Sequence, residues 1–243
     1  GAAYAKGRLE ELEAWVSGLS RRDVIGFFDV SLNGGLIKGD RLLTFATQRF
    51  LNGAFADLPR PFACVATDLA NGREVWLKEG LLVDAVRASI ALPGLLPPHQ
   101  VDGRFLVDGG LVNPVPVSLC RALGSDLVIG VDLGMDTINQ RLRKPGSSAA
   151  PAGWKSRVGR WLGRGEGGED AQRPSLTEVV TNSIAIMQGR ISRSRLAGEP
   201  ADVLITPRLG QLSLLDFHRG SDAIGAGRRA TEHMLPLLHS LFE

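Results

Sequence analysis

The stretch FLVDGGLVNP, residues 105–114, holds the side chain of this sequence that is best placed to do chemistry. An apolar run ends in the carboxylate of Asp108, and Gly109 and Gly110 follow it without side chains that could cover it. An approachable carboxylate can act as a general base and take a proton from a hydroxyl group. Asp-Gly-Gly is also a frequent turn sequence, because Asp accepts backbone N–H bonds and glycine tolerates positive φ. The tripeptide alone therefore does not decide whether Asp108 is a turn residue or a catalytic base.

The flanking patterns place Asp108 at the edge of a sheet. Residues 104–107 are predicted to form a short strand that ends at the carboxylate. Asn113 is a suitable N-cap, and Pro114 a suitable first residue, for a helix that stops at Gly124. Because ligands of open α/β sheets bind outside the carboxyl ends of the strands, we expect Asp108 at a ligand-binding rim.

Strand and helix patterns alternate along much of the chain. Asn71-Gly72 separates two apolar runs and predicts a β-hairpin, since this dipeptide tolerates positive φ at both turn positions. Residues 127–133 are apolar on both faces, which is typical of a central parallel strand covered by helices. Helical spacing of apolar residues is found over residues 1–18, 40–52, 81–90, 176–196 and 220–241. We therefore predict an α/β fold with a mostly parallel central sheet and helices on both faces.

Residues 1–243 are predicted to form one domain, interrupted by an insertion at residues 141–173. Gly, Ser, Ala and Pro dominate that insertion, which favours a mobile segment. Within it, Trp, Val and Leu alternate with Lys and Arg at helical spacing over residues 154–164, as in a basic amphipathic helix at a lipid surface. The glycines in the same stretch equally favour a solvated linker. Peripheral membrane contact through residues 154–164 is thus an open alternative.

Composition narrows the partners and the compartment. Lys plus Arg number 28 and Asp plus Glu 26, and the net charge of +2 gives no field strong enough to predict nucleic acid as a partner. Cys64 and Cys120 lie in apolar stretches, which is typical of buried thiols in a reducing compartment. The sequence shows neither a bilayer-spanning apolar run nor a signal-peptide pattern. We therefore expect a cytoplasmic protein.

No cofactor or metal ion is predicted. Residues 225–230 fit the pattern G-x-G-x-x-A, but they fall inside a helical pattern without the preceding strand that dinucleotide binding requires. Asp132 and Asp136 lack companion His, Cys or carboxylate residues at metal-ligand spacing.

Five segments of the sequence carry a resemblance to a known family. They are VATDL at residues 65–69, VRASIALPGLLPP at 86–98, DGRFLVDGGLVNPVPV at 102–117, ALGSDLVIGVDL at 122–133 and, more loosely, LDFHRG at 215–220. In order and spacing they resemble the patatin-like phospholipases, in particular the bacterial branch. The resemblance implies a patatin-like three-layer sandwich and hydrolysis of lipid esters by a Ser-Asp dyad. It also implies that Asp108 is the dyad acid and that Gly109 and Gly110 are the motif glycines.

The sequence departs from this family at the nucleophile. The family places its serine in a G-x-S-x-G elbow and its oxyanion donors in an earlier glycine-rich loop, and neither motif occurs in these residues. GAAYAKG at residues 1–7 is similar to the helix that follows the elbow, joined about six residues after the serine. We therefore expect the serine and the oxyanion loop outside this chain, in a longer parent protein. The chain alone is expected to be nearly inactive.

Residues 86–98 form a motif stretch that is expected to approach the pocket. Ser89, Leu92, Leu95 and Leu96 are candidates to line an acyl-chain pocket. A core turn explains the three leucines equally well. Ser89 lacks the flanking glycines of a nucleophile, which favours a polar packing role.

Two other functions remain open. One is a noncatalytic lipid-binding or interaction module that keeps the scaffold without the serine. The other is a His-dependent esterase, because His99 lies near Asp108 in a Pro-rich loop and His218 follows later in the chain. His233 and His239 fall on the last predicted helix, where packing or surface roles are typical.

Overall fold

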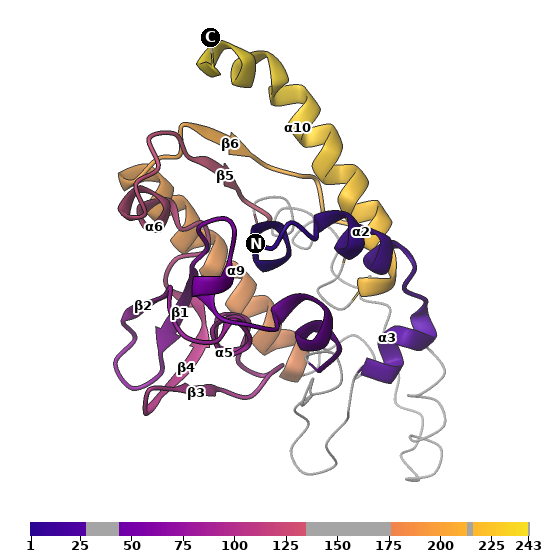
Figure 1. Ribbon diagram of the computed structural model, residues 1–243, viewed down its shortest axis with the longest axis vertical. Coiled ribbons are helices and arrows are strands. Elements are labelled where there is room, and N and C mark those ends of the chain that lie inside the picture. Colours follow the sequence, from indigo (N-terminus) through magenta and orange to yellow (C-terminus); the bar gives the residue numbers. More distant parts are fainter. Residues whose placement is uncertain (28–43, 135–175, 213–215, 243) are drawn as a thin grey trace, which may run out of the picture.

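The computed structural model describes residues 1–27, 44–134, 176–212 and 216–242 (Figure 1). Its strands form a four-stranded sheet of order β2-β1-β4-β3 and a separate pair, β5-β6. The strands are β1 (Cys64–Asp68), β2 (Glu74–Leu77), β3 (His99–Val101), β4 (Arg104–Asp108), β5 (Ile129–Val131) and β6 (Val203–Ile205). The predicted insertion at residues 141–173, Asp136, and the first part of the predicted helix over residues 40–52 lie outside the described residues.

The four-stranded sheet is antiparallel throughout, so the predicted mostly parallel central sheet is not confirmed. Two hairpins account for two of its three pairings, and the third joins β1 to β4. Asn71-Gly72 lies in the turn that connects β1 and β2, as predicted, although of these two residues only Gly72, with a φ of 71°, has positive φ. Asp102-Gly103 connects β3 and β4, with φ values of 47° and 77°, as a tight hairpin turn requires. Among the described strands, only β5 and β6 pair in parallel.

The helices follow the predicted ranges closely where the periodicity was strong. They are α1 (Ala2–Ala5), α2 (Leu9–Ser17), α3 (Arg21–Phe27), α5 (Leu82–Ser89), α6 (Val117–Ala122), α9 (Leu176–Gly198) and α10 (Gly220–Phe242). A short π-helix, η1 (Thr47–Leu51), and the 3-10 turns η2 (Phe55–Asp57), η3 (Gly109–Leu111) and η5 (Phe217–Arg219) complete the set. The predicted first helix is divided at Gly7, whose φ is 73°. None of the helices within these ranges combines the length and the hydropathy that crossing a bilayer requires.

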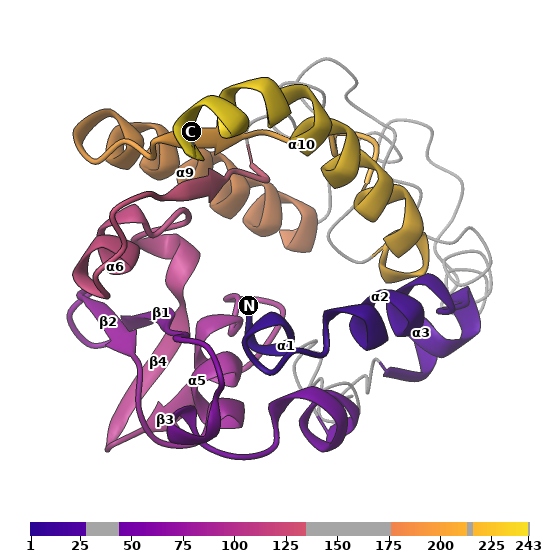
Figure 2. The ribbon, with the colours of Figure 1, turned by 45° about the horizontal axis from the view of Figure 1, so that its top comes forward.

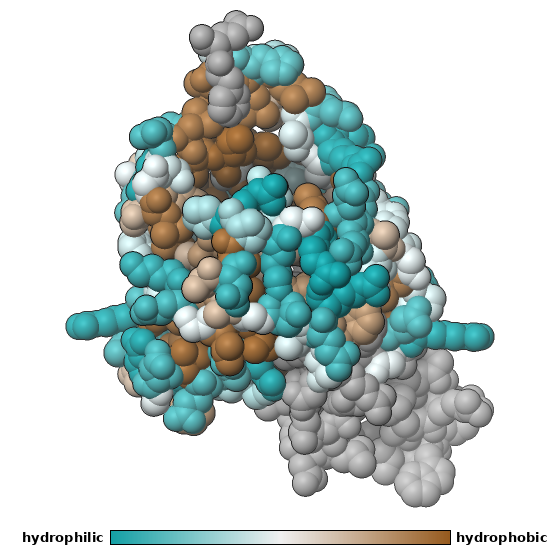
Figure 3. Space-filling model, in the orientation of Figure 1, coloured by the Kyte–Doolittle hydropathy of each residue, from teal (hydrophilic) through white to brown (hydrophobic). Residues whose placement is uncertain are grey.

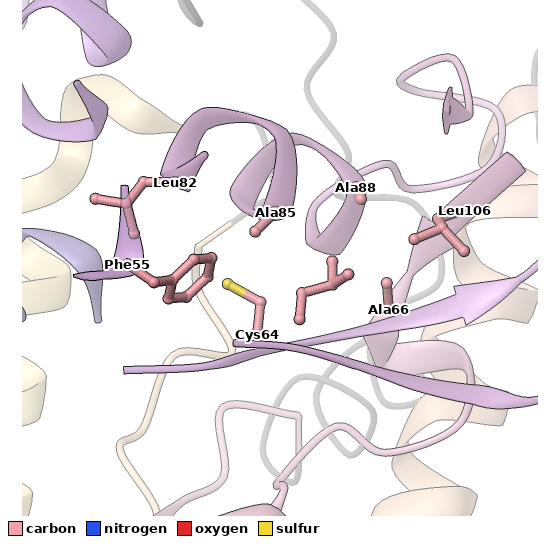
Figure 4. Close-up of a cluster of buried hydrophobic side chains, with 8 residues drawn as sticks. Phe55, Cys64, Ala66, Leu82, Ala85, Ala88 and Leu106 are labelled. Carbon is pink, nitrogen blue, oxygen red and sulfur yellow. The ribbon is translucent and has the colours of Figure 1, made fainter. Parts of the chain in front are cut away.

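One face of the four-stranded sheet packs against α5 and forms the main core (Figure 4). The side chains that meet there are Phe55, Cys64, Ala66, Leu77, Leu82, Ala85, Ala88 and Leu106. Alternate residues of a strand share a face, so the side chain of Asp108 lies on the same face as Leu106. Asp108 also stands opposite Ala66 in the register of β1 and β4. The carboxylate is therefore directed to the α5 side of the sheet.

Helix α1 lies on this same side of the sheet. Ala2 and Ala3 belong to a second cluster with Phe50 and Leu51, and Phe62 and Val86 pack against it. Figure 2 shows α1 beside α5. The beginning of the described chain and the end of β4 thus face a common region.

Strand β5 buries only one of its faces, and the predicted burial on both faces is wrong for the described residues. Gly130 and Asp132 are buried, whereas Ile129, Val131 and Leu133 are 42%, 48% and 56% exposed. The buried face meets Val115 and α9, which contributes Ser192. Figure 3 shows hydrophobic surface over the upper half of the molecule, where β5, β6 and the end of α10 lie.

Candidate active site at the end of β4

The backbone of Asp108 is held on both sides. Its N–H donates to the carbonyl of Ala91, just after α5, at 3.0 Å. Its own carbonyl accepts a hydrogen bond of 2.8 Å from the hydroxyl of Thr67 on β1. The last residue of β4 is thereby fixed between the neighbouring strand and the loop that leaves α5, which limits how far its side chain can move.

The carboxylate of Asp108 is half-buried and bonded to the backbone that follows it. Its Oδ1 accepts a hydrogen bond of 2.6 Å from the N–H of Gly110, and Asp108 caps η3 in this way. Burial raises the pKa of the Asp108 carboxyl above its ordinary value of 3.8, and the bond from Gly110 offsets part of that rise. A carboxylate with a raised pKa is a stronger base, so the site has the desolvation expected of a proton acceptor.

The two glycines after Asp108 are required for different reasons. A Cβ on Gly109 would lie 2.2 Å from the carbonyl oxygen of Val65, so the loop can approach β1 closely only without a side chain. A Cβ on Gly110 would lie 2.5 Å from Nε2 of Gln188 and 2.8 Å from Oδ1 of Asp108. The side chain of Gln188, on α9, and the carboxylate of Asp108 thus both lie against Gly110. No local pattern in the sequence pointed to Gln188.

Asn113 does not cap a helix, contrary to the sequence prediction. Helix α6 begins at Val117, and Pro116 precedes it at the N-cap position. The Asn113 side chain is buried and donates to Oε1 of Glu74 at 2.9 Å and to the hydroxyl of Ser118 at 3.3 Å. Its amide is needed to satisfy the Glu74 carboxylate, and this contact outweighs a capping role.

The predicted pocket residues lie at the end of α5 and in the turn that follows it, next to the site. Ser89 hydrogen-bonds the thiol of Cys64, and burial raises the pKa of that thiol to about 12, so it stays protonated. Leu92 is buried, and its carbonyl accepts the N–H groups of Leu95 and Leu96 at 3.0 and 2.9 Å. These leucines form a tight turn next to Ala91, which bonds Asp108. Their role in lining an acyl-chain pocket stays a prediction.

The histidines contact groups other than Asp108. Nε2 of His99 lies 2.9 Å from Oδ1 of Asp84 on α5. His218 accepts a hydrogen bond of 3.2 Å from Nε of Arg21, and His233 bonds the carbonyl of Arg229 within α10. These contacts give no support to a triad built on Asp108. His239 is exposed near the end of α10.

The described ranges contain no group of three His, Cys, Asp or Glu side chains that could hold a metal ion. Asp132, considered above as a metal ligand, accepts hydrogen bonds of 2.9 Å from the N–H of Gly134 and from the hydroxyl of Ser192. Both Asp132 and Ser192 are buried. This carboxylate therefore links the end of β5 to α9.

Comparison with known proteins places this site in a family context. Residues 1–121, which include Asp108, match the family model described as patatin-like phospholipase. An uncharacterized NTE family protein of Mycobacterium tuberculosis is 30% identical over 279 residues, covering 94% of this chain and 78% of the relative. A second NTE family protein of the same organism is 29% identical over 216 residues, covering 88% of this chain and 35% of the relative. The lysophospholipase NTE1 of Coccidioides immitis is 26% identical over 191 residues, covering 79% of this chain and 12% of the relative.

Proposed function

The chain belongs to the patatin-like phospholipase family, and on that premise we propose that it is the acid-bearing part of a lipid acyl hydrolase with a Ser-Asp dyad. The observation that carries the proposal is the carboxylate of Asp108, which is half-buried at the carboxyl end of β4 and has a raised pKa. The lysophospholipase among the relatives supports an ester of a lipid as the substrate class.

In this mechanism Asp108 is the general base. A serine hydroxyl from outside these 243 residues attacks the ester carbonyl, and Asp108 takes its proton directly. Gly110 already occupies Oδ1 of the carboxylate, so we assign proton transfer to Oδ2. Backbone N–H groups of a glycine-rich loop, also outside this chain, hold the oxyanion. The bond between the carbonyl carbon and the alcohol oxygen of the lipid then breaks, and Asp108 returns the proton to that leaving alcohol. A water molecule, deprotonated in turn by Asp108, releases the acyl group as a carboxylic acid and restores the serine. The start of α1 lies on the same side of the sheet as the carboxylate, where an incoming serine has access.

The test is hydrolysis of short-chain esters by the protein that includes the residues before Gly1. We expect Asp108→Asn to lower kcat by at least about 100-fold, the usual contribution of a general base. Asp84→Asn is the matched control, because Asp84 lies on the same side of the sheet and binds His99 instead. Full activity in Asp108→Asn would overturn the proposal. Loss of activity in Asp84→Asn alone would favour the His-dependent esterase.

A noncatalytic lipid-binding or interaction module on a patatin-like scaffold is the second candidate. Peripheral membrane contact through residues 154–164 is compatible with both the hydrolase and the lipid-binding module. Sedimentation with anionic vesicles, with and without residues 141–173, measures that contact. Vesicle binding by a full-length protein without ester hydrolysis would support the module, and equal sedimentation of both forms would remove the membrane role of residues 154–164.

A further inference from the structure

We propose that Glu74 and Arg195 form a positioning pair that fixes the loop behind Asp108 and thereby sets the orientation of its carboxylate. The consequence for catalysis rests on the proposed function. The effect of the pair on the Asp108 carboxylate can be measured in a protein that hydrolyses no substrate.

The pair holds the two residues that follow η3. Nη2 of Arg195, on α9, donates to Oε2 of Glu74, on β2, at 2.7 Å, and its Nε donates to the carbonyl of Val112 at 3.2 Å. Oε1 of Glu74 accepts from Nδ2 of Asn113 at 2.9 Å and from Nε1 of Trp76 at 2.7 Å. A strand and a helix that lie far apart in the sequence thus both bind the segment of Val112 and Asn113.

The positions of Val112 and Asn113 affect Asp108 through the short segment of residues 109–111. The N–H groups of Val112 and Asn113 donate to the carbonyl of Gly109 at 3.1 and 2.9 Å. The next residue, Gly110, supplies the N–H that holds Oδ1 of Asp108. Movement of Val112 and Asn113 would therefore rotate the peptide that bonds the carboxylate.

The Glu74 end of this network is shielded from solvent, whereas the Arg195 side chain is 37% exposed and Trp76 is exposed as well. The Glu74 side chain is 16% exposed and accepts from three donors, and Asn113 is 3% exposed. A shielded carboxylate that loses one of its donors bears a desolvation cost, which makes the arrangement sensitive to either partner. The planar guanidinium of Arg195 reaches a carboxylate and a carbonyl at once, and a lysine ammonium does not reproduce that fork.

Helix α9 is aligned for this task by two further contacts on the same face. Gln188, Ser192 and Arg195 are spaced four and three residues apart, so they share one side of the helix. The hydroxyl of Ser192 donates to buried Asp132 at the end of β5, and Gln188 lies over Gly110. The helix therefore contacts the Asp108 loop through Gln188 and Arg195, and the hydrogen bond of Ser192 to Asp132 between them fixes the position of the helix along its axis.

The elements around Asp108 carry other charged groups, and the experiment must separate the effect of their charges from the effect of position. On the described parts of β1, β3, α5 and α9 they are Asp68, Asp84, Arg87, His99, Arg190, Arg193 and Arg195. Asp68 bonds the β1–β2 turn at Ala70, and Asp84 bonds His99. None of these changes in the variant Glu74→Gln.

The measurement is the pKa of Asp108 by carboxyl-carbon NMR titration of the full-length protein, with the signal assigned through Asp108→Asn. Loss of a carboxylate in Glu74→Gln lowers the Asp108 pKa if only charge matters, whereas a loosened Gly110 bond raises it. We expect a rise. Arg195→Lys keeps the charge and is expected to raise the pKa as well, while the control Arg193→Lys, exposed on the same helix, leaves it unchanged.

A fall or no change in Glu74→Gln, together with no change in Arg195→Lys, would overturn the positioning role. Thermal unfolding of each variant shows whether it is folded, and Arg195→Lys serves as the milder change if Glu74→Gln does not fold. In the active protein we expect Arg195→Lys to lower kcat by roughly tenfold to 100-fold with little change in KM. If the pKa shifts are found but even the unmodified protein hydrolyses no ester, the positioning pair stands and the proposed function fails.

Discussion

At the scale of single residues, the environment of Asp108 in the folded protein disfavours the ionised form of its carboxyl group. Its folded-state pKa lies above the ordinary value of 3.8, because the half-buried carboxylate loses solvation that one bond from Gly110 only partly replaces. The protonated carboxyl is therefore the form that suits the fold, while a general base must be ionised to work. Such a conflict is typical of a functional position, where stability is given up for reactivity.

This conflict predicts how the stability of Asp108→Asn depends on pH. The stabilisation from the protonated carboxyl is fully present below pH 3.8 and is lost as the pH rises through the raised pKa. At pH 7 the ionised side chain costs about 1.4 kcal/mol for each unit of pKa shift. The amide keeps an acceptor for Gly110 and carries no charge, so we expect a higher free energy of unfolding than in the unmodified protein at pH 7. Urea unfolding at pH 7 and near pH 4 checks this, and a gain that is larger at the acidic pH would contradict it.

The sequence was informative about Asp108 and its glycines, because their adjacency after an apolar run is a local pattern. It was silent about Glu74, Gln188 and Arg195 for a physical reason. A charged residue on a short strand or a helix is usually solvated, and α9 carries Arg190 and Arg193 as well as Arg195. Only packing against the Asp108 loop selects Arg195 from this set.

At the scale of elements, the sequence carries the turn signals of both hairpins of the antiparallel sheet but not the strand β3, and it does not show that one face of β5 is open. Asp102-Gly103 carries the same turn signal as Asn71-Gly72, but β3 is only three residues long and too short to be predicted by periodicity. Ile129 and Val131 are as apolar as core residues, and nothing in their local pattern tells which face other elements cover. Burial depends on the arrangement of distant segments, which periodicity does not encode.

The approach of the Asp108 loop to β1 gives a second prediction at this scale. Gly109→Ala places a Cβ against the carbonyl of Val65, and the backbone on both sides must move, so we expect a loss of about 3 kcal/mol in the free energy of unfolding. Gly110→Ala meets only the ends of two side chains, Nε2 of Gln188 and Oδ1 of Asp108, which can turn aside more easily than a backbone, so the expected loss is smaller, about 1 kcal/mol.

Urea unfolding of the two variants measures this difference. The double variant Gly110→Ala with Gln188→Ala is the control, because removal of the Gln188 side chain relieves the closer of the two contacts that Gly110→Ala creates. Equal losses in Gly109→Ala and Gly110→Ala would show that the loop does not depend on its close contact with Val65.

At the scale of the whole molecule, the described elements follow one another around a ring (Figure 2). From the sheet, α9 leads to β5 and β6, then to α10, which lies against α2, and α1 returns to α5. Ion pairing of Arg228 with Glu13, and the hydrogen bond between Arg21 and His218, connect the two ends of this path. The site lies where the sheet, α1, α5 and α9 meet, away from the contact between α2 and α10.

The α2–α10 contact supplies the last prediction. Gly220, the first residue of α10, has no room for a side chain, since a Cβ would lie 2.1 Å from Cγ1 of Val16 and 3.2 Å from its carbonyl oxygen. Gly220→Ala is therefore expected to lower the free energy of unfolding by about 1–3 kcal/mol, and Val16→Ala in the same chain should recover part of it. Gly227→Ala is the matched control on α10, because a Cβ there meets nothing within 4 Å and alanine favours the helix by about 1 kcal/mol.

Denaturant unfolding measures the stabilities of these variants, and NMR titration measures the pKa of Asp108 in each. We expect Gly220→Ala to weaken the protein and to leave the Asp108 pKa unchanged, because the backbone bonds that fix Asp108 come from β1, η3 and the loop after α5. A shift of that pKa in Gly220→Ala would show that closure of the ring, in addition to the local loop, sets the environment of the carboxylate. Stability equal to that of Gly227→Ala would instead show that α10 does not depend on its close contact with α2.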